Sequence, residues 1–130
     1  PTPQAAFALW LEHANNALEF VQTYGEPTDE VWFTEIGCLN YGDHQVNGPI
    51  CQAEGFMPTY ASLILNWLNG EGRWVTRYAW YTDWTNKYYK VTMLLSDVYP
   101  PDYTGPLPLS ELGQFYANID AAASIPLPWP

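Results

Sequence analysis

Hydrophobic positions along the 130-residue chain recur with two different periods. Apolar residues return every three or four positions from about residue 3 to 24, from about 53 to 69, and from 111 to about 122, which predicts three amphipathic helices. Pro3 and Ser110 suit helix starts, and Gly25 suits a helix end. Two shorter runs rich in β-branched and aromatic residues, 31–36 and 73–81, predict strands.

The first strand is apolar on both of its faces. Strict alternation sorts its residues into two sets of three: Val31, Phe33 and Glu35, then Trp32, Thr34 and Ile36. A strand of this kind is typical of a parallel sheet covered on both sides. The predicted order is therefore α-β-loop-α-β-loop-α, an α/β fold. Two parallel strands alone leave edges and faces uncovered, so we expect the chain to be part of a larger sheet.

Glu35 is the main candidate for chemistry because it lies at the carboxyl end of this strand, just before Gly37. In parallel α/β sheets ligands bind beyond the carboxyl ends of the strands. The alternative is a structural role, in which the carboxylate caps a backbone group or pairs with an arginine.

The second strand ends in an aromatic cluster at the edge where Glu35 is expected. Its aromatic members are Trp80, Tyr81 and Trp84, and the polar residue Asp83 lies among them. Alternation turns Trp80 inward with Tyr78 and Thr76, and turns Arg77 toward the helices, where an ion pair is expected. Aromatic clusters are often simply core, but the polar neighbours here favour a binding surface.

The polar loop 37–53 is long for a connection between a strand and a helix, which favours a binding role for Asn40, Tyr41, Asp43 and His44. Cys38 and Cys51 lie in or next to this loop, and either a disulfide or two free thiols fits their spacing. His13, on the first helix, is expected to be a solvated side chain. Two cysteines and two histidines at these positions argue against a zinc site, and we expect neither a metal nor a cofactor.

The composition narrows the classes of molecule that the chain is expected to bind. Fourteen acidic residues against four basic ones give a formal net charge of −10, which disfavours nucleic acid and anionic membrane surfaces. Only 14% of residues are charged, whereas 17% are aromatic. Aromatic rings among neutral polar side chains suit carbohydrate.

Three segments together resemble glycoside hydrolase family 128, the β-1,3-glucanases of clan A, which are (β/α)8 barrels. Val31–Cys38, VWFTEIGC, is similar to the family's seventh-strand segment, and Arg77–Tyr81, RYAWY, to its eighth-strand segment. Leu107–Tyr116, LPLSELGQFY, resembles the segment that leads into the last helix.

The resemblance implies that Glu35 is the nucleophile of a retaining glycosidase and that Trp80 stacks on the sugar ring at the cleavage point. Tyr78, Tyr41, Trp84 and Asn40 are further candidates for sugar contacts. A retaining mechanism also needs a second carboxyl group, which clan A enzymes supply from an Asn-Glu pair. The chain contains no Asn-Glu pair, so the acid/base is expected outside it.

We therefore expect residues 1–123 to form the C-terminal portion of a (β/α)8 TIM barrel, its last two βα units plus a preceding helix, with 124–130 as a proline-rich tail. The parent protein is expected to be a secreted β-glucanase whose N-terminal barrel portion is the partner of this chain, and the isolated chain is expected to be inactive. The alternatives are a non-catalytic carbohydrate-binding or interaction module, and one half of a heteromeric barrel.

Overall fold

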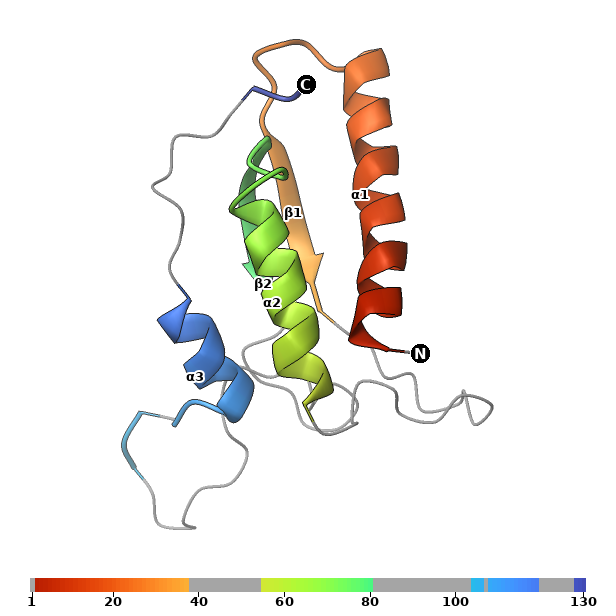
Figure 1. Cartoon of the computed structure of the whole chain (residues 1–130). Helices are drawn as coiled ribbons and strands as arrows, with labels where there is room; N and C mark the ends of the chain where they lie inside the picture. Colours follow the sequence, from red (N-terminus) through yellow and green to blue (C-terminus); the bar gives the residue numbers. More distant parts are fainter. Residues whose placement is uncertain (1, 38–54, 81–103, 107, 120–127) are drawn as a thin grey trace, which may run out of the picture.

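The computed structural model describes residues 2–37, 55–80, 104–106, 108–119 and 128–130 (Figure 1). Within these ranges the elements follow in the predicted order: α1 Pro3–Tyr24, β1 Val31–Ile36, α2 Phe56–Leu68, β2 Val75–Trp80 and α3 Glu111–Asn118. The two strands pair in parallel, which confirms the α/β prediction. Alternating parallel strands and helices are consistent with part of a (β/α)8 barrel.

Local capping fixes where the helices begin. The Thr2 hydroxyl accepts a hydrogen bond from the Ala5 amide at 3.1 Å at the start of α1. The Ser110 hydroxyl accepts one from the Gly113 amide at 2.9 Å at the start of α3, which confirms the predicted cap. Gly55 precedes α2 with φ of 73°, a left-handed conformation that glycine adopts without a Cβ clash.

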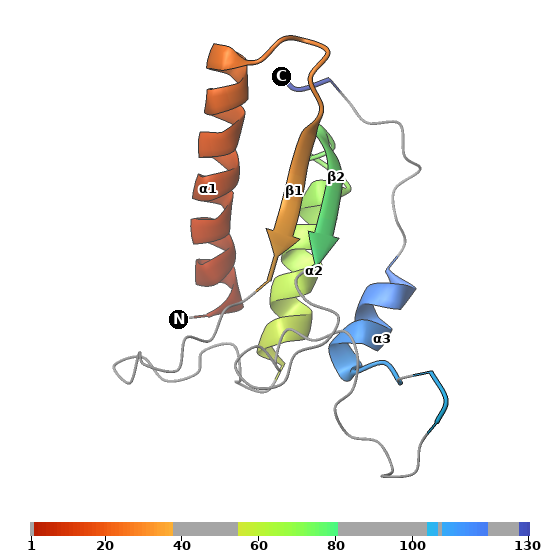
Figure 2. The ribbon, with the colours of Figure 1, turned by 180° about the vertical axis from the view of Figure 1, so that it is seen from behind.

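The core lies between α2 and one face of the β1–β2 sheet (Figure 1). Seven residues of α2 are buried, and they are packed with residues of both strands. On the other face Trp32 is 54% exposed, and Figure 2 shows this face with no helix of the described chain across it. The prediction that β1 is covered on both sides is therefore wrong for the residues described.

Four aromatic rings join α1, α2 and the sheet in a closed edge-to-face cycle. Trp10 of α1 meets Phe33 of β1 at 6.0 Å, and Phe33 meets Trp74 at 5.9 Å. Trp74, just before β2, meets Trp67 of α2 at 6.0 Å, and Trp67 returns to Trp10 at 5.3 Å. Each such pair contributes about 0.5 to 1.5 kcal/mol beyond the area it buries. We call these four residues the aromatic cycle.

Gly72 allows Trp67 to occupy its place in the aromatic cycle. A Cβ added at Gly72 would lie 2.2 Å from Cζ3 of Trp67, well inside van der Waals contact. The Gly72 amide also donates a hydrogen bond to the Trp67 carbonyl at 2.8 Å. The turn between α2 and β2 is thus packed directly beneath the indole, where only glycine fits.

The last residues of the chain lie beside the start of β1. The indole nitrogen of Trp129 donates to the Asp29 carbonyl at 3.3 Å, and the Gln22 side chain donates to the Pro130 carbonyl. Trp129 is packed against the core although it lies in the stretch expected to be a tail. These contacts hold the connection between α1 and β1 from outside.

Gly72→Ala is expected to lower the free energy of unfolding by about 1 to 3 kcal/mol, because the methyl group must displace a ring held by Trp10 and Trp74. Gly70→Ala is the matched control, since its Cβ would approach the Asn66 carbonyl oxygen at 3.3 Å and no ring. Urea denaturation of both variants measures the difference. Equal losses at the two positions would contradict the packing role of Gly72.

Stability is also expected to fall at alkaline pH. Burial raises the pKa of Tyr60 from its usual 10 to about 12, so the folded chain keeps a proton that the unfolded chain loses between these values. The stabilisation is complete below pH 10 and is lost as pH rises toward 12. The slope of unfolding free energy against pH reports how many protons the chain releases on unfolding. In this window Tyr60→Phe should reduce that number by up to one, which makes the slope shallower. An unchanged slope would show that Tyr60 is not protected from ionisation.

Candidate active site at the carboxyl edge of the sheet

Glu35 lies at the edge of the sheet where both strands end. Ile36, the next residue, is paired with Trp80, the last residue of β2. The side chain of Glu35 is exposed, whereas Ile36 is only 2% exposed. The expected juxtaposition of Glu35 and the end of the second strand is thus present.

A β-bulge changes the direction of the side chains around Glu35. Phe33 is paired with Tyr78 and Ile36 with Trp80, so three steps along β1 correspond to two along β2. As a result Ile36 is in the core and Phe33 packs against it from the same side, although strict alternation predicted opposite faces for them. Bulges re-aim side chains and are frequent beside active sites. The extra residue falls at Thr34 and Glu35.

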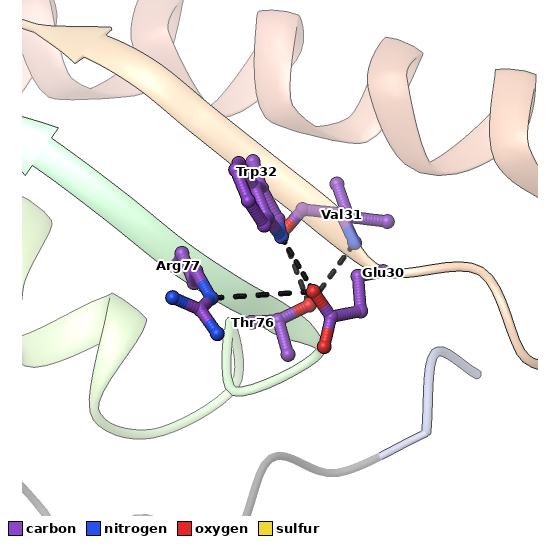
Figure 3. Close-up of polar contacts among 5 residues, drawn as sticks. All are labelled: Glu30, Val31, Trp32, Thr76 and Arg77. Carbon is purple, nitrogen blue, oxygen red and sulfur yellow. Dashed lines mark hydrogen bonds and ion pairs between the residues drawn. The ribbon is translucent and has the colours of Figure 1, made fainter.

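A second irregularity lies at the start of the sheet, where the Thr76 hydroxyl takes the place of a backbone hydrogen-bond partner for Val31 (Figure 3). Val31 is paired with Val75, but Trp32 is paired with Arg77, so Thr76 is the extra residue of β2. Its hydroxyl accepts from the Val31 amide at 3.0 Å and donates to the Val31 carbonyl at 3.2 Å. This side chain satisfies both backbone groups of Val31 at the bulge.

Glu35 lines an open cavity of about 280 Å³ between β1 and α1. Two members of the aromatic cycle, Trp10 and Phe33, form an apolar wall of this cavity. His13 and Thr34 add polar groups to its lining. The remaining lining residues are Ala14 and Ala17. An ionisable carboxylate, an imidazole and a hydroxyl beside aromatic walls form a surface that can receive a polar ring compound.

His13 is the site residue that sequence reasoning missed. It is exposed, as expected of a solvated side chain, but it also lines the cavity that contains Glu35. Helical spacing carried a usable signal, because Trp10, His13, Ala14 and Ala17 follow the i, i+3, i+4, i+7 pattern of one helix face. The polar character of His13 concealed its place on that face.

Trp80 and Tyr78 lie on the face of the sheet that packs against the helices. Trp80 is 8% exposed, and its ring is 6.1 Å from that of Tyr116 in α3. Burial raises the pKa of Tyr78. Burial, and secondarily the charge that Tyr78 would carry, raise the pKa of Tyr116. The end of β2 is thus closely packed against α3.

Arg77 points the opposite way from the prediction. Its side chain is 68% exposed on the open face of the sheet and does not face the helices. The prediction that Trp80 and Tyr78 face inward is wrong, because both pack on the helix side of the sheet. Arg77 alternates with these two residues and therefore faces away from the helices. An ion pair is present, since Arg77 Nε lies 4.0 Å from Oε2 of Glu30.

The other candidates lie outside the described residues. They are Asn40, Tyr41, Asp43, His44, Tyr81, Asp83 and Trp84, together with Cys38 and Cys51. Within the described ranges, no group of three or more His, Cys, Asp or Glu side chains is placed to hold a metal ion. None of the helices described there is both long and apolar enough to cross a membrane.

Parallel strands that alternate with helices define this chain as an α/β protein, and Glu35 lies at the carboxyl edge that the two strands share. The chain belongs to the glycosyl hydrolase catalytic core family, whose model matches residues 4–116. Membership implies a carbohydrate substrate. Comparisons with curated proteins and with solved structures give no significant match.

Thr76→Val is expected to lower the free energy of unfolding by about 1 to 2 kcal/mol, because the part-buried amide and carbonyl of Val31 lose their partner while the side-chain volume is kept. Thr23→Val is the matched control, since the Thr23 hydroxyl bonds to the Glu19 carbonyl on an exposed helix surface. Chemical denaturation gives both values. A loss at Thr76 no larger than that at Thr23 would contradict its role in the register.

Proposed function

We propose that this chain supplies the nucleophile strand and the final strand of a retaining glycoside hydrolase barrel that acts on β-glucan. Family membership over residues 4–116 supports the reaction class. The exposed position of Glu35 at the carboxyl edge of parallel strands, beside a cavity, is the observation that carries its role.

The proposed reaction has two steps. The Glu35 carboxylate bonds to the anomeric carbon while the glycosidic C–O bond breaks, and the departing oxygen takes a proton from an acid supplied outside this chain. Water, deprotonated by the same outside group, then attacks the anomeric carbon and releases Glu35. Glu30 does not replace that group, because it lies at the opposite end of β1 from Glu35.

The motifs favour β-1,3-glucan and glycoside hydrolase family 128 within this proposal. Trp80, Tyr78, Tyr41, Trp84 and Asn40 remain proposed sugar contacts. For Trp80, stacking on a sugar requires the indole to turn away from Tyr116, against which it is packed. A secreted location is part of the proposal.

Glu35→Ala in the complete catalytic domain is expected to reduce kcat on β-1,3-glucan by about 10⁴-fold or more, because the covalent intermediate is lost. Added azide should restore cleavage of an activated aryl glucoside and yield the inverted glycosyl azide. Glu19→Gln, at an exposed site on α1, is the control and should retain activity. The 130-residue chain alone should be inactive.

Three results would contradict the proposal. Full activity of Glu35→Ala would remove Glu35 from the mechanism. Hydrolysis by the isolated chain, abolished by Glu35→Gln, would show that no outside acid/base is needed. Binding of β-glucan without hydrolysis by the complete domain would favour a carbohydrate-binding module instead.

A further inference from the structure

Three side chains form a polar cluster on the open face of the sheet, at the end away from Glu35 (Figure 3). Oε2 of Glu30 accepts a hydrogen bond from the Trp32 indole at 2.8 Å and lies 4.0 Å from Arg77 Nε. The Arg77 guanidinium carbon lies 5.0 Å from the centre of the Trp32 ring. We call these residues the open-face cluster.

The open-face cluster is held in place but not covered. Trp32 and Arg77 are register partners, so their side chains rise from neighbouring strands on the same face. Their exposed fractions are 54% for Trp32 and 68% for the Arg77 side chain. A sheet that is packed on one face and carries an indole on the other favours a further layer of protein over that indole.

The charge of the cluster indicates what that layer contains. Among the described residues, Arg77 contacts a carboxylate only through the long contact between its Nε and Oε2 of Glu30. The same oxygen also accepts the hydrogen bond from the Trp32 indole. The two terminal nitrogens of Arg77, drawn in Figure 3, carry four further N–H donors. Covering an arginine without an acceptor for these donors is strongly unfavourable, whereas a bidentate carboxylate satisfies both. An acidic side chain in the covering layer would satisfy these donors and also balance the charge of Arg77.

We propose that the open-face cluster is the contact surface for further strands of the same barrel, and that one of these strands places a carboxylate on Arg77. The inference rests on the proposed function, because it takes the chain as part of a barrel. The cluster lies at the amino ends of the strands, away from the ligand edge, which favours a protein contact over a glycan contact. Arg77 would then be a stability residue that fastens this chain to the rest of the domain.

Arginine-specific labelling with phenylglyoxal tests this on the unmodified protein. The chain has two arginines, Arg73 and Arg77, which peptide mass spectrometry separates. Labelling of Arg77 should be about tenfold slower or more in the complete catalytic domain than in the 130-residue chain, because it requires local opening. Arg73 is the internal control and should change less.

Arg77→Met provides a second measurement. In the complete domain it leaves the partner carboxylate buried and unpaired, so the unfolding constant should rise by about 100-fold or more, and Arg77→Lys should recover part of the loss. In the isolated chain Arg77→Met should change the constant by less than about fivefold, as for an exposed ion pair. Arg73→Met should change the unfolding constant by the same factor in the complete domain and in the isolated chain.

Equal labelling of Arg77 in chain and domain would overturn the inference, and so would protection of Arg77 in the chain by soluble β-glucan oligosaccharide. The same preparations are assayed for β-glucan hydrolysis. An active domain with exposed Arg77 refutes this inference alone, whereas an inactive domain with protected Arg77 refutes only the proposed function.

Discussion

The aromatic cycle of Trp10, Phe33, Trp67 and Trp74 is the interaction on which the rest of the arrangement depends. It joins both longer helices to the sheet with rings 5.3 to 6.0 Å apart, and every ring meets its neighbours edge to face. Because Trp10 and Phe33 also line the cavity beside Glu35, the packing that holds the fold together sets the shape of the site. Gly72 is a consequence of the same packing, since the Trp67 ring occupies the space that a Cβ would need.

The two faces of the sheet differ in the residues that they carry and in what they contact. One face is apolar and packs on α2, and the other carries Trp32, Arg77 and the Glu30 carboxylate. This asymmetry suits a barrel segment, whose outer face meets helices and whose inner face meets other strands. The open-face cluster is thus compatible with the family match.

The sequence predicted the elements better than the directions of their side chains. Periodicity and capping residues are local, so the bounds of α1, the cap at Ser110 and the strand 31–36 were all predicted correctly. The position of Glu35 at the shared carboxyl edge follows from strand polarity and was also predicted. The bulges at Thr76 and Thr34–Glu35 depend on the register between two strands, which no single segment encodes. For that reason Ile36 was assigned to the wrong face. Trp80 and Arg77 were assigned to each other's faces because alternation does not say which face of the sheet the helices cover. The polar character of His13 concealed its place beside the cavity.

The central claim is that Glu35 forms a covalent bond to the sugar. The most direct measurement incubates the complete catalytic domain with an activated 2-deoxy-2-fluoro-β-glucoside and locates the label by peptide mass spectrometry. Fluorine at C2 slows both steps, and a good leaving group restores the first, so the glycosyl-enzyme accumulates. We expect one labelled carboxylate, Glu35, with loss of activity in proportion to labelling. A label on any other carboxylate of an active enzyme would contradict it.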